Sequence, residues 1–181
     1  MKRSFVCTAI FLYAFVLGTI AAHAQQPSPM PAGSMSEAHK HAPPAGPLEI
    51  TFGDKSATWT PTTLAALPHV SVTVHNEHSK ADETYSGVPL IALLTALGVT
   101  DKPRGKDLRL YVLAAGFDGY EVVYSIGEVT PDVHDATVLV ADKENGEPLD
   151  ADGPLKLVAT GEKRPARWVR NLVAIKVQAA D

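Results

Sequence analysis

The chain has 181 residues, of which 45% are hydrophobic and 20% charged, and its formal net charge is −4 at pH 7. This acidic balance argues against a nucleic-acid partner, because binding to a phosphate backbone needs a basic surface. Cys7 is the one cysteine, which excludes a fold stabilised by disulfides within the chain.

The N-terminal segment has the order of a secretory signal peptide. Lys2 and Arg3 precede an apolar run over residues 5–22, which ends in small residues before Ala24. We expect cleavage after Ala24, so that residues 1–24 are the signal peptide and the mature protein is periplasmic. The alternative is a retained membrane anchor, since the run approaches the ~20 residues of a spanning helix. The small residues at the end of the run favour cleavage of the segment. We therefore expect no stable membrane anchor in the mature protein.

Residues 25–47 are predicted to be a disordered linker. They are rich in Pro, Ala, Gly and Ser and hold hardly any large apolar residue, so they cannot bury enough surface to offset the entropy of ordering. Removal of the leader also takes away two basic residues, which leaves 14 basic against 20 acidic residues and a net charge of −6. Four linker residues are ligands that copper accepts, although a polar linker is the simpler interpretation. They are Met30, Met35, His39 and His41.

Residues 48–181 are predicted to form one α+β domain, built mostly of mixed β-sheet layers with a few short helices. Leu48–Phe52 alternates apolar and polar residues and indicates a strand. The pair Thr60-Pro61 predicts a helix start, with the hydroxyl as cap and proline at the first helical position. A second strand is expected over 70–76, where valines alternate with polar residues.

A polar segment, 76–84, then interrupts the apolar pattern. After it, leucines at three-and-four spacing between Leu90 and Leu97 predict an amphipathic helix closed by Gly98. The next two strands are expected at 108–114 and 120–124, joined as a hairpin around a glycine-rich turn.

The C-terminal part of the domain is predicted to be mainly sheet. Ser125 and Glu128 have the spacing of a capping box, which predicts a short helical turn. The remaining strands are expected at 137–141, 155–159 and 168–177. The first of these is a continuous apolar run, which is typical of a central strand buried on both faces.

Several short motifs occur in an order that resembles a known family. They are Tyr85-Ser86-Gly87-Val88-Pro89-Leu90, Asp118-Gly119-Tyr120, Asn145-Gly146-Glu147-Pro148-Leu149, Gly153-Pro154-Leu155-Lys156-Leu157-Val158 and Arg167-Trp168-Val169-Arg170. Together they are similar to the oxidoreductase molybdopterin-binding domain family, the sulfite-oxidase-like proteins, over nearly all of residues 48–177. The resemblance implies layered sheets that bind molybdopterin, with molybdenum attached to a protein cysteine.

The sequence departs from this family at the metal. The resemblance places the cysteine at or just beyond the strand 70–76, and no cysteine occurs there. Neither His75 nor Asn76 reproduces a soft anionic thiolate. Molybdopterin therefore stays the cofactor that the resemblance implies, and cysteine-ligated molybdenum is not expected.

Basic residues gather near the C-terminus of this acidic chain, on the segment that in the family lies beside the pterin and its phosphate. They are Lys163, Arg164, Arg167 and Arg170. Guanidinium groups suit phosphate oxygens, so these residues are candidates for cofactor binding together with His75 and Asn76. A regular strand over 168–177 would place Arg167 on its inward face. There it either holds an anion or pairs with an acidic residue such as Glu162 or Glu121.

Two further groups of candidates are weaker. Asp118 and Tyr120 lie near the cofactor cleft by resemblance, although an aspartate before glycine is also an ordinary turn residue. His75, Glu77 and His78 could form a metal site only if a turn brought all three together, so no metal ligand is assigned.

Three functions are compatible with these observations. The leading hypothesis is a periplasmic binding module for a pterin-like or other small anionic ligand, without cysteine-ligated molybdenum. The first alternative is a molybdopterin-dependent oxidoreductase subunit with a non-cysteine ligand and a periplasmic redox partner. The second is a periplasmic copper- or zinc-binding protein. The missing cysteine leaves open whether the chain is an enzyme.

Overall fold

The structure is a computed structural model that describes residues 46–77, 79–149 and 152–181. The predicted signal peptide and all but the last two residues of the predicted linker lie outside these ranges. Within them, no helix is both long enough and apolar enough to cross a membrane.

The first sheet has five strands in the order β2-β1-β10-β5-β6. They are β1 (Leu48–Phe52), β2 (Lys55–Trp59), β5 (Leu110–Gly116), β6 (Glu121–Ser125) and β10 (Leu172–Ala179). Strands β1 and β10 run parallel, and the other neighbours run antiparallel. The sheet is therefore mixed, as predicted.

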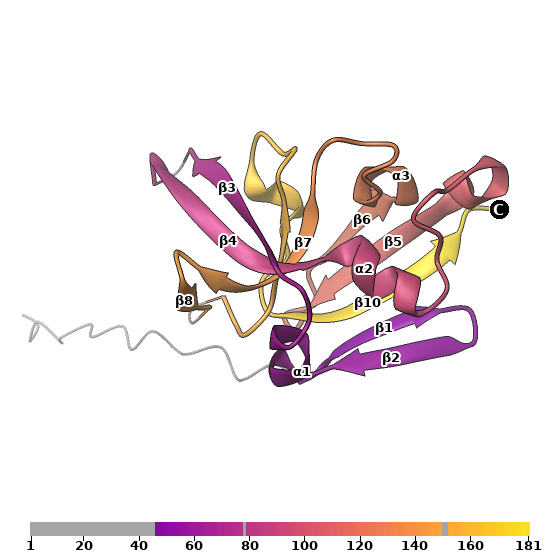
Figure 1. Ribbon diagram of the computed structural model, residues 1–181, viewed down its shortest axis with the longest axis horizontal. Helices are drawn as coiled ribbons and strands as arrows, with labels where there is room; N and C mark the ends of the chain where they lie inside the picture. Colours follow the sequence, from indigo (N-terminus) through magenta and orange to yellow (C-terminus); the bar gives the residue numbers. More distant parts are fainter. Residues whose placement is uncertain (1–45, 78, 150–151) are drawn as a thin grey trace, which may run out of the picture. The chain divides into compact units, whose positions relative to one another are not determined.

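The second sheet has the order β3-β4-β7-β8, and β9 also pairs with β7. Its strands are β3 (Val70–Asn76), β4 (Ala81–Pro89), β7 (Val138–Glu144), β8 (Glu147–Pro148) and β9 (Lys156–Ala159). All of its pairings are antiparallel. In Figure 1 the strands β3, β4 and β8 lie to the left of the strands of the first sheet.

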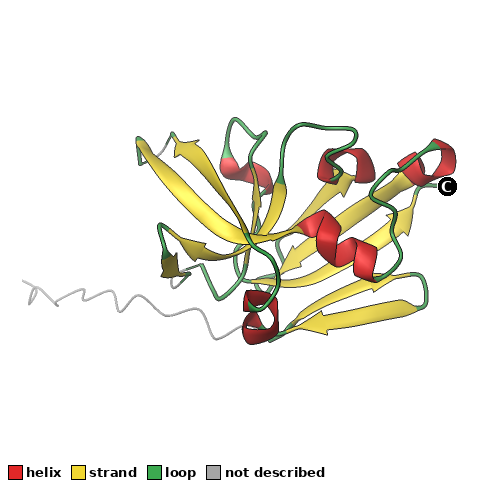
Figure 2. Cartoon of the chain, in the orientation of Figure 1, coloured by secondary structure: helices red, strands yellow, loops and turns green. Residues whose placement is uncertain are grey.

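The helices are short and occupy the connections between strands (Figure 2). They are α1 (Pro61–Ala65), α2 (Leu90–Ala96), α3 (Ile126–Val129) and the 3₁₀ helices η1 (Gly105–Arg109) and η2 (Pro165–Arg167). Both predicted caps are confirmed, because the hydroxyls of Thr60 and Ser125 accept hydrogen bonds from the backbone N–H groups of Thr63 and Glu128.

Two apolar clusters lie on opposite faces of the second sheet. The main core combines α2 with inward residues of both sheets, including Val138 and Val140 of β7. Leu139 and Ala141, the alternate residues of β7, belong to a second cluster. Strand β7 is thus buried on both faces, which confirms the prediction of a central strand. Trp168 packs against both clusters.

At Gly87 the backbones of strands β4 and β7 leave no room for a side chain. A Cβ atom built there would lie 2.1 Å from the carbonyl oxygen of Val140. The register of the β4–β7 ladder also shifts between Ser86 and Gly87. The glycine in this motif is therefore required by backbone contact.

The predicted first residues of two strands are wrong, and the local backbone conformation explains both differences. Strand β10 begins at Leu172 rather than at residue 168, since Asn171 has a positive φ of 48° and the register shifts between Leu172 and Ala174. The strand predicted at 108–114 begins at Leu110, because the preceding residues form η1.

Two further strand segments were not predicted because their side chains lack an apolar alternation. Strand β2 has only exposed and half-exposed residues. Strand β4 begins at Ala81, inside the polar segment 76–84, where it pairs with β3 as a hairpin. The backbone hydrogen bonds between strands form equally well when the side chains are polar and face solvent. Composition alone therefore does not identify these strands.

Candidate functional site

A cavity of about 430 Å³ lies between the end of β3 and the segment that follows β9. The β3 side contributes residues 73–77, and the other wall consists of Thr160, residues 162–165 and Trp168. The cavity brings together two regions that the sequence singled out. His75 and Asn76 come from the first wall, and Lys163 and Arg164 come from the second.

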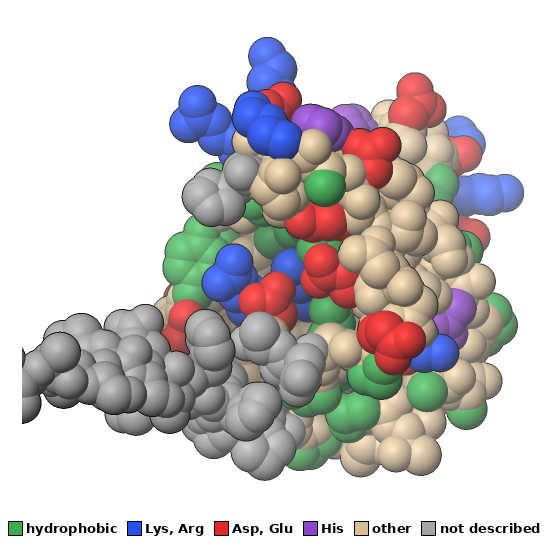
Figure 3. Space-filling model, turned by 90° about the vertical axis from the view of Figure 1, so that its left-hand side faces the viewer, with side chains coloured by type: hydrophobic (Ala, Val, Ile, Leu, Met, Phe, Trp, Pro, Cys, Tyr) green, Lys and Arg blue, Asp and Glu red, His purple; other side chains and the backbone are tan. Residues whose placement is uncertain are grey.

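Figure 3 looks toward the β3–β4 side of the molecule. Basic side chains project there beside histidine, above a hollow that holds side chains of both charges.

Lys163 and Arg164 are the unpaired cations of this cavity. Both are exposed, and neither side chain has a hydrogen bond or ion pair with any described residue. Arg164 directly precedes η2, whose first residue is Pro165. Two neighbouring cations without an internal counter-charge are available to an anion, and a guanidinium can hold two of its oxygens at once.

The β3 wall carries polar side chains that are already paired across the β3–β4 hairpin. His75 Nδ1 and Asp82 Oδ1 are 2.8 Å apart, and Asn76 Nδ2 donates to Glu83 Oε1 at 2.6 Å. Glu77 accepts from Lys80 Nζ at 2.7 Å. Because a carboxylate only accepts, the ring N–H of His75 donates to Asp82.

The metal candidates of this wall do not form a three-ligand site in the described ranges. His78 lies outside those ranges. Within them, no group of three or more His, Cys, Asp or Glu residues is arranged to hold a metal ion.

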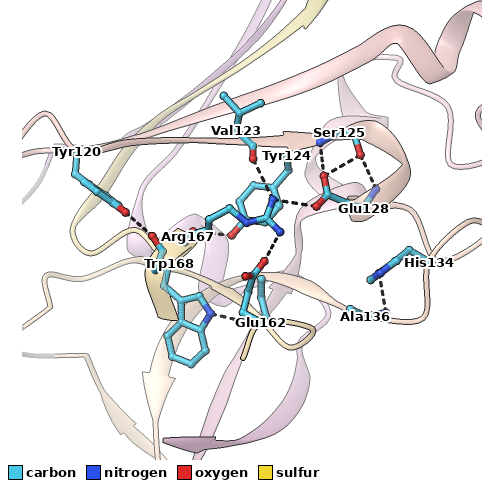
Figure 4. Close-up of polar contacts among 12 residues, drawn as sticks. Tyr120, Val123, Tyr124, Ser125, Glu128, His134, Ala136, Glu162, Arg167 and Trp168 are labelled. Carbon is cyan, nitrogen blue, oxygen red and sulfur yellow. Dashed lines mark hydrogen bonds and ion pairs between the residues drawn. The ribbon is translucent and has the colours of Figure 1, made fainter. Parts of the chain in front are cut away.

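Arg167 is engaged by two carboxylates (Figure 4). Its Nη1 donates to Glu128 Oε1 at 2.9 Å, and its Nη2 donates to Glu162. The guanidinium also lies over the ring of Tyr124, 4.5 Å from its centroid. The pairing with Glu162 is one of the two predicted alternatives. The predicted inward strand face is wrong, because Arg167 lies in η2 and not in a strand.

The contacts of Arg167 favour its own charged form and that of Glu128. Partial burial opposes ionisation of Glu128, but hydrogen bonds from the Ser125 N–H and hydroxyl and from Arg167 lower its pKa below the ordinary value. Partial burial likewise disfavours the charged form of Arg167, yet Glu162 and Glu128 raise its pKa above the ordinary value. Arg167 therefore fixes η2 to α3 and the loop after β9, beside the cavity rather than in it.

Arg170, whose side chain is 75% exposed, lies at the edge of a buried polar network that sequence reasoning did not identify. Its Nε lies 3.0 Å from Asp152 Oδ1, and Lys156 Nζ donates to Asp152 Oδ2 at 2.6 Å. Lys156 also donates to the hydroxyl of Tyr85 at 3.0 Å, and that hydroxyl donates to Glu83. Burial and the neighbouring Glu83 raise the pKa of Tyr85 above its ordinary range, so the hydroxyl stays protonated. The sequence feature that could have indicated this network is Lys156, a lysine within the otherwise apolar segment 155–159.

Asp118 and Tyr120 do not line the cavity. Asp118 Oδ1 accepts from the backbone N–H of Tyr120 at 3.0 Å, which is the turn role predicted as the alternative. The Tyr120 hydroxyl donates to the carbonyl of Ala166. Tyr120 therefore anchors η2 from the first sheet, and the hairpin supports the cavity wall from a distance.

Comparisons with known proteins identify the family and support the fold. The profile of the oxidoreductase molybdopterin-binding domain family matches residues 48–181. The sulfane dehydrogenase SoxCD from Paracoccus pantotrophus has a similar structure, with a TM-score of 0.57 and 20% identity over 74% of this chain. At that identity the similarity shows the fold alone. The DNA primase small subunit PriS of Thermoplasma volcanium is 33% identical over 82 residues, or 45% of this chain.

The matched region is a minor part of both proteins. It covers 39% of the SoxCD chain and 23% of PriS.

Proposed function

Because the chain belongs to the oxidoreductase molybdopterin-binding domain family, we propose that residues 48–181 are a binding module for a pterin-like anion. The ligand lies in the cavity between β3 and the segment after β9. Lys163 and Arg164 hold its anionic group, and molybdenum is not attached through a cysteine.

The observation that carries this proposal is the pairing state of the four predicted basic residues. Arg167 is paired with Glu128 and Glu162, and Arg170 is paired with Asp152, which it shares with Lys156. The other two, Lys163 and Arg164, have no described partner and both line the cavity. The volume of about 430 Å³ lies within the range of about 300–1,000 Å³ that is typical of small-molecule pockets. An acidic chain thus places two adjacent unpaired cations at a concave surface.

The organic part of molybdopterin suits these residues, and the metal does not suit them in the usual way. Two adjacent cations match a phosphate, and the indole of Trp168 in the same cavity matches a planar ring. The metal would need a thiolate, and the chain has no cysteine after Cys7. We therefore derive no reaction step through molybdenum.

Calorimetry on the mature domain tests this function with 6-carboxypterin and inorganic phosphate as probes. Replacing both Lys163 and Arg164 by alanine should weaken binding of each probe about tenfold or more, since two charge-assisted contacts are lost. The control removes two exposed lysines elsewhere, Lys102 and Lys106. Equal affinity in both double variants would contradict the proposed site.

We also propose that this module works in the periplasm after removal of residues 1–24. The supporting observation is the order of charged, apolar and small residues in that segment. N-terminal sequencing of the protein from a periplasmic extract should begin at Gln25. Recovery of the protein in membranes with residue 1 intact would contradict export by cleavage.

A second candidate function is an oxidoreductase subunit in which a nitrogen donor replaces the cysteine. The specific observation that favours it is the contact between His75 and Asp82, because a carboxylate on one ring nitrogen orients the other for a metal. Stoichiometric molybdenum in protein from the native host, lost on substitution of His75 by alanine, would support it. A metal-free protein would exclude it.

A further inference from the structure

Trp168 separates the cavity from the buried polar network. It lines the cavity, and its Nε1 donates to the carbonyl of Ala159 at 3.0 Å. The ring of Tyr85 meets it edge-on, with centroids 5.4 Å apart and planes at 84°. Lys156 Nζ lies 5.4 Å from the centroid of the Trp168 ring. Three neighbours therefore fix the indole.

Lys156 is an unusual residue for this position. Its side chain is only 7% exposed, and its ammonium lies over both aromatic rings, 4.7 Å from the centroid of Tyr85 and 5.4 Å from that of Trp168. It donates to the Tyr85 hydroxyl and to Asp152. A buried ion pair adds little stability over an apolar residue of the same volume, so stability alone does not account for a lysine here.

We propose that Lys156 is a positioning residue which, together with Tyr85, holds Trp168 as a stacking surface for the ring of a planar heteroaromatic ligand. The inference rests on the proposed function, in which Lys163 and Arg164 hold the anionic group of the same ligand. The ammonium lies over one face of the indole, and Trp168 also lines the cavity. A flat heteroaromatic ring is a ligand that stacks on an indole held in this way.

Recognition of the ligand then has two separable parts. Inorganic phosphate has no ring and depends only on Lys163 and Arg164. A pterin that carries an anionic group uses these cations and also the indole of Trp168. Substitution of Lys156 should therefore weaken binding of the pterin and leave binding of phosphate unchanged.

Tryptophan fluorescence can directly follow the contact between the ligand and the indole of Trp168. The chain has two tryptophans, so substitution Trp59→Phe leaves Trp168 as the reporter. In that background we compare Lys156→Met and Lys156→Arg with the control Lys176→Met, an exposed lysine on β10 of the first sheet. The probes are 6-carboxypterin and inorganic phosphate, and thermal unfolding checks that each variant folds.

Lys156→Met should shift the emission of Trp168 without any ligand, because a charge beside the indole is lost. It should weaken the binding of 6-carboxypterin about fivefold or more, a factor that corresponds to the lower end of measured stacking contributions. Phosphate affinity should stay within about twofold, as expected when no direct contact is lost. Lys156→Arg should restore both properties, since arginine keeps the charge and donates to Tyr85 and Asp152.

Several results would overturn the inference. One is a folded Lys156→Met variant with unchanged emission and affinity. Another is equal weakening of both probes, which would indicate collapse of the cavity. If Lys156→Met does not fold, Tyr85→Phe removes only the hydroxyl, and an unchanged pterin affinity there overturns the inference.

Two outcomes separate the inference from the proposal on which it rests. Binding of 6-carboxypterin that is unchanged in folded Lys156→Met and Tyr85→Phe variants would refute the stacking surface alone. Binding of neither probe would refute the proposed function.

Discussion

Substitution of Arg167 by methionine tests whether this residue is structural. Methionine keeps apolar contact with Tyr124 but removes two charge-assisted hydrogen bonds and leaves Glu128 and Glu162 without their shared cation. The side chains of Arg167, Glu128 and Glu162 are 38%, 34% and 20% exposed, so solvent screening reduces the cost. We expect a loss of about 2 kcal/mol in the free energy of unfolding, or about 8 °C in Tm at roughly 4 °C per kcal/mol for a domain of this size.

The pH dependence of this loss follows from Glu128. Its pKa is lower in the folded protein than in the unfolded chain, where it is about 4.3. The stabilisation is therefore complete above about pH 4.3 and is lost as the pH falls through the folded value. Urea unfolding at pH 7 and pH 3 should show a large difference between the wild type and Arg167→Met at pH 7 and a smaller one at pH 3. Equal stability at pH 7, or a difference that does not shrink at pH 3, would refute this reasoning.

Three other substitutions should change stability, and urea unfolding at pH 7 measures each of them. Gly87→Ala should cost about 3 kcal/mol, because its Cβ would lie 2.1 Å from a backbone oxygen of β7; a near-neutral effect would mean that β4 can move away. His69→Ala should cost about 2 kcal/mol, since His69 Nε2 contacts Asp142 Oδ2 at 3.0 Å and the other oxygen of this buried carboxylate has no described partner. Tyr124→Phe should cost about 1 kcal/mol through loss of the hydroxyl that donates to a carbonyl of η2 at 2.6 Å; a stabilised variant would contradict this.

Local interactions account for the parts of the fold that the sequence predicts well. The helix starts at Thr60 and Ser125 depend on side chains within three residues, and both are confirmed. Strand β7 is confirmed, because in a small domain a continuous apolar run between turns must be buried on both of its faces. The family motifs add the order of the strands, which composition alone does not give.

The remaining features depend on contacts between distant residues. The pairing of Arg167 with Glu128 joins positions 39 apart in the chain, and the contact between Lys156 and Tyr85 joins positions 71 apart. No local pattern distinguishes Arg167, which is paired, from Arg164, which is unpaired. The sequence therefore indicated a basic segment, and only the fold shows which of its cations face the cavity.

The most direct test of the proposed binding function is native mass spectrometry combined with metal analysis of protein purified from its own periplasm. We predict a bound species with the mass of a pterin-type anion, no stoichiometric molybdenum, and loss of the bound species when Lys163 and Arg164 are both replaced by alanine. Stoichiometric molybdenum, or a bound species that both substitutions leave in place, would contradict the account.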